Sequence, residues 1–342
     1  MRRVFVGSVL VSASLFLPCA ALADYQAPAG YNSELLTGLP SGFSGLAVNS
    51  TGELAVTDGS TVTLYNTWQN GRTEIGTITD ASWTSDTDPV FLNSTTVLFG
   101  ENGSSDALWE VNFATATPTV TQVTLNGSLP HVAGVALTGS TTALVSGSSA
   151  TGFATGDLYL DSVDLTKTSG NVSSVVSGVG DQYEGDPGVT PGGNLVLLES
   201  KFNGEDSLVH LYNSDGASAE PDVDLSGGNG YGAYGIAFDS SGAAYVTTGD
   251  TITRISDLDA ASPTVTQFGG DPTFNAFFTS ISYTGGSFAA GNPSNTGTLI
   301  IADGSGSGDV FAVFVPEPAT AALLLVSAFG LLSRRRRAGG GR

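Results

Sequence analysis

Apolar and polar residues alternate in short runs along most of the chain, and glycine, asparagine, aspartate or serine stands between the runs. A period of two is typical of half-buried β-strands, and the intervening residues favour tight turns. The runs Thr61–Trp68 and Thr251–Leu258 show the alternation clearly. With 46 glycines in 342 residues, the pattern predicts an all-β domain rather than one with long helices.

The strands belong to an internal repeat. The segment 44–56 returns as the segment 234–246, with the same spacing between its two glycines. Looser copies begin near Asp88, Ala133, Asp186 and Thr279. The starts at 44, 88, 133, 186, 234 and 279 are separated by 44, 45, 53, 48 and 45 residues, and a four-stranded propeller blade takes about 40 to 50 residues. The spacing predicts a six-bladed β-propeller over residues 24–314, with a β-solenoid or a sandwich as the alternative.

The sixth repeat lacks a fourth strand. Fourth strands are predicted at Thr73–Thr79, Thr119–Leu125, Val172–Val176, Asp222–Leu225 and Thr264–Phe268, whereas the sixth repeat runs directly into Pro316. The segment Ser33–Gly38 precedes the first repeat just as the other fourth strands precede theirs. We therefore expect this N-terminal strand to complete the last blade and close the ring, since closure leaves no blade with an open edge.

The sequence of the first repeat also suggests a family. Residues 45–58 read Gly-Leu-Ala-Val, then Gly-Glu-Leu-Ala-Val-Thr-Asp, and this spacing resembles the NHL and gluconolactonase-like propellers. The resemblance covers most of residues 33–314, and the first and fifth copies carry it. A gluconolactonase-like enzyme would use a metal ion to polarise the carbonyl group of a lactone.

Residues 1–23 have the features of a secretory signal peptide. A positively charged start is followed by the apolar run Val4–Leu17, and Ala21 and Ala23 provide a signal peptidase site before Asp24. The alternative is a buried core helix. The leader also contains the only cysteine, so the mature chain would have no disulfide and no thiol chemistry.

The C-terminal segment 315–337 has three ordered parts. They are Pro316, Glu317 and Pro318, the 14-residue apolar run 319–332, and the cluster Arg334, Arg335, Arg336 and Arg337. The run is shorter than the roughly 20 residues of a stable membrane span, and the arginines favour a cytoplasmic end. This arrangement resembles the PEP-CTERM sorting tail of Gram-negative bacteria.

That resemblance implies a route for the protein. The membrane protease exosortase would recognise the tail during a transient stay in the inner membrane, remove it, and release the protein to the cell surface or to an extracellular polysaccharide matrix. A permanent C-terminal anchor is the alternative, and residues 338–342 are an extension without further signal.

The charge of the chain limits its partners. All 32 acidic residues lie between Asp24 and Glu317, and that stretch has four bases, which leaves a formal charge of −28. Such a surface repels phosphate backbones, so we expect no nucleic-acid binding. It suits solubility in salty water or the binding of cations.

Carboxylates recur at two kinds of connection that open on one face of a propeller, around its channel. Asp88, Glu184 and Asp186 precede or begin first strands, and Glu199 ends a second strand. Because Ca²⁺ takes 6–8 oxygen ligands, we select these four residues as candidate Ca²⁺ ligands. The alternative is that such carboxylates accept backbone hydrogen bonds in their own turns.

Other candidate residues favour structural roles. His210 lies on an alternating strand. Trp68, Trp83 and Trp109 could stack on sugar rings, but Trp68 and Trp109 lie on third strands, where packing between blades is favoured. No Gly-x-Ser-x-Gly motif with a suitable partner accompanies His131. The sequence thus favours a secreted, non-enzymatic propeller that binds polysaccharide or another surface protein. The alternative is a metal-dependent lactonase, hydrolase or lyase with an acidic site at the channel mouth.

Overall fold

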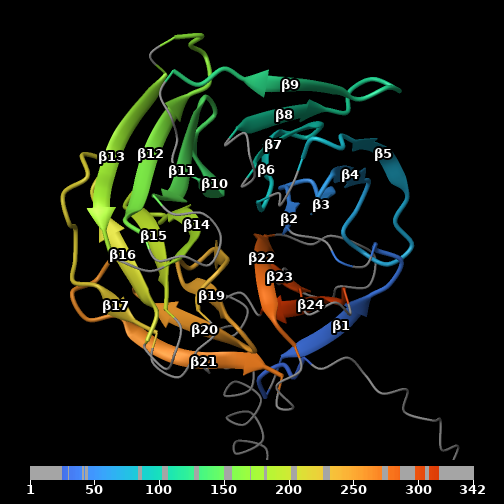
Figure 1. The fold of residues 1–342 in the computed structure, drawn as a ribbon. Helices are drawn as coiled ribbons and strands as arrows, with labels where there is room; N and C mark the ends of the chain where they lie inside the picture. Colours follow the sequence, from blue (N-terminus) through green and yellow to red (C-terminus); the bar gives the residue numbers. More distant parts are fainter. Residues whose placement is uncertain are drawn as a thin grey trace, which may run out of the picture.

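The computed structural model describes residues 25–29, 31–40, 42, 45–83, 87–101, 107–126, 131–149, 156–169, 171–180, 183–201, 206–225, 232–271, 276–285, 297–304 and 308–315. Within these residues, 24 strands form six four-stranded antiparallel sheets, which stand around a central axis in Figure 1. The all-β, six-bladed propeller is confirmed. None of the described residues forms a helix long and apolar enough to cross a membrane. The leader and the sorting tail lie outside the described residues.

Each blade follows the chain from the inside of the ring to the outside. Blade 1 contains β2 (Gly45–Val48), β3 (Leu54–Asp58), β4 (Thr61–Tyr65) and β5 (Glu74–Thr79), and blade 2 contains β6 (Val90–Asn93), β7 (Thr96–Gly100), β8 (Leu108–Asn112) and β9 (Thr119–Val123). Blade 3 contains β10 (Val132–Gly139), β11 (Thr142–Ser148), β12 (Leu158–Asp164) and β13 (Val172–Val179). Blade 4 contains β14 (Tyr183–Val189), β15 (Leu195–Ser200), β16 (Leu208–Tyr212) and β17 (Val223–Asp224).

The remaining two blades differ in how they are completed. Blade 5 contains β18 (Ile236–Phe238), β19 (Ala244–Thr248), β20 (Thr251–Ser256) and β21 (Thr264–Gly270). Blade 6 takes β22 (Phe278–Thr284), β23 (Gly297–Asp303) and β24 (Val310–Val315) from the end of the chain and β1 (Asn32–Leu36) from its beginning. Strand β1 runs antiparallel to β24, with Asn32 opposite Phe314 and Leu36 opposite Val310.

The core consists of six apolar clusters, one between each pair of neighbouring blades. The second strands supply both sides of a blade, because successive side chains of a strand point to opposite faces. On β23, Leu299 and Ile301 pack toward blade 5, whereas Ile300 packs toward blade 1. Every residue of β7, β15, β19 and β23 is buried. The second strands are therefore buried on both faces, because each packs against two neighbouring blades.

The segment around β1 contacts three blades. The Gln26 N–H donates to the Gly270 carbonyl of blade 5 at 2.7 Å, and the buried Tyr25 ring lies 5.7 Å from the ring of Phe278 in blade 6. On the other side, Asn70 of blade 1 accepts from the Thr37 N–H at 2.8 Å, and the Arg72 guanidinium donates to the Thr37 carbonyl at 2.6 Å.

Candidate functional site

A cavity of about 640 Å³ lies inside the ring. Its lining comes from the first strands of all six blades: β2, β6, β10, β14, β18 and β22. It extends from Asp88 and Asp186, near the start of their strands, to Ser50 and Ser94 in the turns that follow β2 and β6. Cavities of this size hold drug-sized ligands in other proteins.

The first strands also bring backbone groups to the cavity. Each pairs with the second strand of its own blade, so its other edge faces the axis with N–H and C=O groups that need partners. In blade 1 these partners come from blade 6, because Ser280 Oγ accepts from the Leu46 N–H at 3.1 Å and Ser282 Oγ accepts from the Val48 N–H at 3.0 Å. The lining is therefore a mixture of apolar side chains and polar groups.

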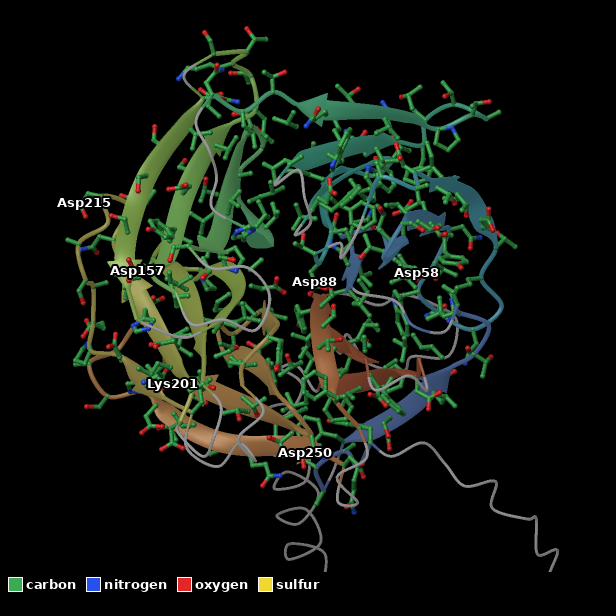
Figure 2. All side chains as sticks on the ribbon, in the orientation of Figure 1. Asp58, Asp88, Asp157, Lys201, Asp215 and Asp250 are labelled. Carbon is green, nitrogen blue, oxygen red and sulfur yellow. The ribbon has the colours of Figure 1, made fainter. Side chains whose placement is uncertain are left out.

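Asp88 and Asp186 meet at one end of the cavity, where their carboxyl groups hydrogen-bond to each other. Asp88 also accepts from the Leu46 N–H at 3.3 Å and from the Ser280 hydroxyl. Figure 2 shows Asp88 near the middle of the ring, whereas Asp157 and Asp215 lie at its periphery. Residues of blades 1, 2, 4 and 6 thus join in one hydrogen-bonded group.

Local backbone features aim the two carboxyl groups inward. Asp186 lies within a β-bulge between Glu184 and Pro187, and bulges commonly redirect a side chain. Each aspartate precedes a proline, Pro89 or Pro187. Proline lacks an N–H group and is tolerated here because the first strand is an edge strand.

Glycines in the alternate blades make room for the pair. A Cβ atom at Gly45 would lie 2.3 Å from Oδ1 of Asp88, and one at Gly134 would lie 2.3 Å from Oδ1 of Asp186. The third glycine, Gly235, lies less tightly against the start of β22, where a Cβ atom would lie 3.1 Å from the Ile281 N atom and 3.3 Å from the Ser280 Cα atom. Blades 1, 3 and 5 therefore present glycine where blades 2, 4 and 6 present a polar side chain. This alternation is visible in the sequence, because the glycines stand at the second residue of their repeats and the polar residues at the first or second. It was not among our predictions.

The environment of the pair raises the pKa of both carboxyl groups. Burial raises the pKa of Asp88 to about 6, although its hydrogen bonds with Asp186, Ser280 and the Leu46 N–H oppose the rise. Burial also raises the pKa of Asp186 well above its usual range, and the charge of Asp88 raises it further. Two carboxyl groups this close do not both ionise readily, so the ionisation of each one disfavours that of the other.

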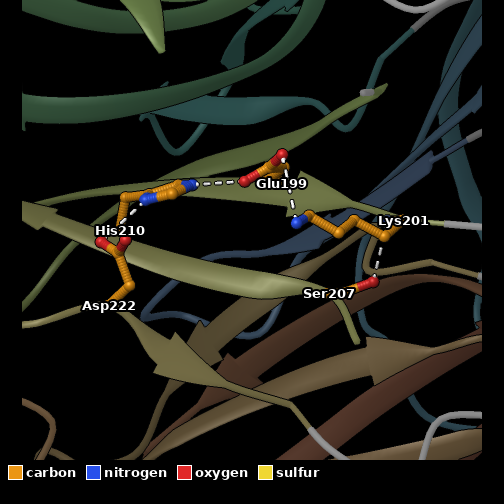
Figure 3. Close-up of polar contacts among 5 residues, drawn as sticks. All are labelled: Glu199, Lys201, Ser207, His210 and Asp222. Atoms are coloured by element: carbon orange, nitrogen blue, oxygen red, sulfur yellow. Dashed lines mark hydrogen bonds and ion pairs between the residues drawn. The ribbon is translucent and has the colours of Figure 1, made fainter. Parts of the chain in front are cut away.

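Glu199 belongs to a different group, in blade 4. Its Oε2 lies 2.9 Å from His210 Nε2, and His210 Nδ1 lies 2.8 Å from Asp222 Oδ1 (Figure 3). Lys201 Nζ lies 3.9 Å from the other carboxylate oxygen of Glu199. Burial lowers the pKa of His210, but the hydrogen bonds to Glu199 and Asp222 outweigh it, so the pKa lies above its usual value. His210 has the structural role that the sequence predicted, because it links the second strand to the outer edge of the blade.

The four predicted Ca²⁺ ligands do not form one cluster among the described side chains. The structure brings together Asp88 and Asp186, whereas Glu199 points between blades, toward Gly180, and bonds His210. Glu184 stands opposite Glu199 in the sheet, and its side chain lies outside the described residues. The described residues contain no group of three or more His, Cys, Asp or Glu side chains placed to hold a metal ion. The Ca²⁺ site stays a prediction.

The cavity extends from the pair toward the face of the first-to-second turns. We predicted an acidic site at the other face, where the fourth-to-first connections lie. Most of that face, including residues 84–86, 127–130 and 181–182, lies outside the described residues. The acidic site at that face therefore stays a prediction.

Other predicted features of this part of the chain have structural partners. Trp68 and Trp83 are each 2% exposed and pack in the clusters between blades, and the sequence favoured this role for Trp68. The Trp109 indole N–H donates to Glu101 Oε2 at 3.1 Å, and Asp303 Oδ1 accepts from the Phe277 N–H at 2.9 Å. These second-strand carboxylates therefore accept hydrogen bonds within their own blades.

Comparison with known proteins shows the fold. No protein-family model matches the chain, and no curated protein sequence matches it. Among solved structures, virginiamycin B lyase from Staphylococcus aureus with quinupristin gives a TM-score of 0.55 at 13% identity, over 83% of this chain and 99% of that chain. The PQQ domain of pyranose dehydrogenase from Coprinopsis cinerea gives 0.58 at 10% identity, over 85% and 97%. A carbohydrate-active enzyme from Trichoderma reesei, in its calcium structure, gives 0.58 at 13% identity, over 85% and 96%. At these identities the likeness extends to the propeller alone.

Proposed function

We propose that this protein is an exported, surface-sorted β-propeller that binds an extracellular ligand in the cavity inside its ring. The observation that carries the proposal is the cavity of about 640 Å³ with a hydrogen-bonded acid pair at one end. An apolar cavity with a few converging polar groups is the usual form of a small-molecule site. The enzymes among the similar structures use the same fold, which does not by itself imply catalysis.

The export part of the proposal rests on the ends of the chain. The signal peptide would be cleaved after Ala23, and Glu317 with its flanking prolines would direct exosortase to the tail. The last strand, β24, ends at Val315, immediately before Pro316. Pro316 cannot donate to a sheet, and Pro318 restricts Glu317 to extended backbone, so the motif suits a linear peptide that a protease reads outside the folded ring. Delivery to the surface or the polysaccharide matrix would follow.

We also infer that β1 closes the ring energetically. It pairs with β24 along five residues, and the residues on either side of it contact blades 5 and 1. Closure by an early strand would couple the two ends of the propeller and remove an exposed sheet edge.

A second function is favoured by the acid pair itself. Two adjacent carboxyl groups with raised pKa values can supply an acid and a base within one site, which is an arrangement used in hydrolysis and elimination. The alternative is therefore a lyase or hydrolase, with or without a metal such as Ca²⁺, whose reacting groups include Asp88 and Asp186.

One experiment separates these functions. Protein recovered from the outside of the producing cells would be tested against a panel of glycans and lactones, with and without Ca²⁺, for binding by calorimetry and for turnover by chromatography. Binding without turnover supports the binding function. Turnover that disappears in both Asp88→Asn and Asp186→Asn supports the enzyme. A panel with neither binding nor turnover, extended to amines, would count against the cavity as a ligand site.

A further inference from the structure

We propose that the cavity takes a small organic cation with an apolar body, whose ammonium group is bound by Asp88 and Asp186. This inference rests on the proposed function, in that the cavity is taken to bind a ligand, and it adds the chemical class of that ligand. The cavity has two acidic side chains at one end and many apolar side chains along its wall. A ligand must therefore combine a positive charge with an apolar body.

Apolar side chains are distributed around the wall among its polar groups. They include Val90, Val135, Val189, Ile236, Phe238 and Ile281. These side chains favour hydrocarbon or aromatic groups, at roughly 25 cal/mol for each Å² removed from water. They give no compensation for the hydration that a charged group loses, whereas the end of the cavity where the two carboxyl groups lie can bind a positive charge.

The acid pair has acceptor capacity for an ammonium group. The carboxyl oxygens of Asp88 and Asp186 have several lone pairs, and they contact each other, the Leu46 N–H and the Ser280 hydroxyl. An ammonium group brings three donors and no acceptor. A ligand carboxylate would be repelled by the same oxygens, and a neutral alcohol would gain hydrogen bonds without the attraction between charges.

The charge of the whole domain favours the same ligand. The stretch from Asp24 to Glu317 has a formal charge of −28, which raises the local concentration of cations near the protein. A divalent metal ion fits less well, because Ca²⁺ takes 6–8 oxygen ligands and the lining includes only two carboxylate side chains among the described residues.

Binding of a cation should favour the ionised forms of the two carboxyl groups. Among the residues that line the cavity, the titratable side chains are Asp88, Asp186 and Tyr283, and the groups that face the pair from other strands are the Ser280 hydroxyl and the Leu46 N–H. A positive charge beside two carboxyl groups favours their ionised forms. Because the pKa of Asp88 is about 6, amine binding should release protons and should strengthen as the pH rises through about 6.

The test uses three probes of one shape and the full-length exported protein. These are 4-phenylbutylamine, 4-phenylbutan-1-ol and 4-phenylbutanoate, measured by titration calorimetry at neutral pH in two buffers of different ionisation enthalpy. We expect the amine to bind at least roughly tenfold more tightly than the alcohol, with proton release in the amine titration alone. Asp88→Asn and Asp186→Asn should each remove most of the preference for the amine.

The control is Asp215→Asn, at an exposed turn in which an amide oxygen can still accept from the Ala217 N–H; it should leave all three titrations unchanged. Thermal melts confirm that each variant is folded, and if one acid-pair variant is not, the other carries the comparison. An amine that binds no better than the alcohol overturns the cation inference and leaves the cavity as a ligand site. Failure of all three probes counts against the cavity itself.

Discussion

Replacing Asp88 with asparagine should stabilise the protein at neutral and alkaline pH. Asparagine has nearly the same shape as aspartate, and its carbonyl oxygen can still accept from the Leu46 N–H and the Ser280 hydroxyl. Its amide group can donate to Asp186, whose carboxyl group then no longer lies beside a second acid. The substitution therefore removes the ionisation of one buried carboxyl group and preserves its hydrogen bonds.

The magnitude follows from the pKa of Asp88. Burial raises that pKa from 3.8 to about 6, and each unit corresponds to about 1.4 kcal/mol, so ionised Asp88 costs the folded state about 3 kcal/mol. The folded state binds the proton more tightly than the unfolded chain does. The free energy of unfolding of the natural protein should therefore fall as pH rises from about 4 through about 6, and the full cost should be present above about pH 7.

The assay is thermal and urea unfolding of both proteins across this pH range. At pH 8 we expect Asp88→Asn to be more stable by up to about 3 kcal/mol, or roughly 5–10 °C in Tm for a domain of this size. At pH 4 the two proteins should be alike, because Asp88 is then protonated in the folded state. Asp215→Asn, in an exposed turn, should follow the natural protein throughout.

Two outcomes would refute this reasoning. A constant difference between the two proteins at all pH values would mean that the ionisation of Asp88 does not contribute. A variant less stable than the natural protein at pH 8 would mean that the ionised carboxylate has a partner that offsets its burial, such as a retained cation.

Four further expectations concern other parts of the chain. His210→Ala should lower the free energy of unfolding by about 3 kcal/mol, since it removes the hydrogen bond between His210 and buried Glu199. NMR should show His210 titrating above about 6.5, with its contribution to stability complete below that pH and lost as the pH rises through its folded-state pKa. Deleting residues 24–38 should greatly lower the Tm, because blade 6 loses its outer strand, and an unchanged Tm would remove the closure argument. N-terminal sequencing of the exported protein should begin at Asp24, and intact Met1 would contradict the signal peptide. Glu317→Ala should leave the ring folded but hold the protein, with its tail, in the inner membrane; normal delivery to the surface would break the sorting assignment.

The number of blades could be predicted from the sequence because it depends on local features. The period of two specifies each strand, and the repeat of 44 to 53 residues specifies each blade. The position of the strand at Ser33–Gly38 followed from the missing fourth strand of the last repeat, and β1 spans Asn32–Leu36. Boundaries moved by a few residues, as at Trp68, which lies beyond the end of β4 but is buried between blades all the same.

The candidate site depended on the tertiary structure. Asp88 and Asp186 are 98 residues apart in the chain, and only the ring brings the first strands of blades 2 and 4 together across one axis. Glu199 is also a carboxylate of blade 4, but it lies near the end of the second strand and faces His210 between blades. The raised pKa of Asp88 and the cavity both depend on segments that are far apart in the chain, because these segments surround the carboxyl group and the cavity only in the folded ring. The glycines at 45 and 134 show the same limit: they are visible in the sequence, but their purpose becomes clear only when the neighbouring blade places a carboxyl group against them.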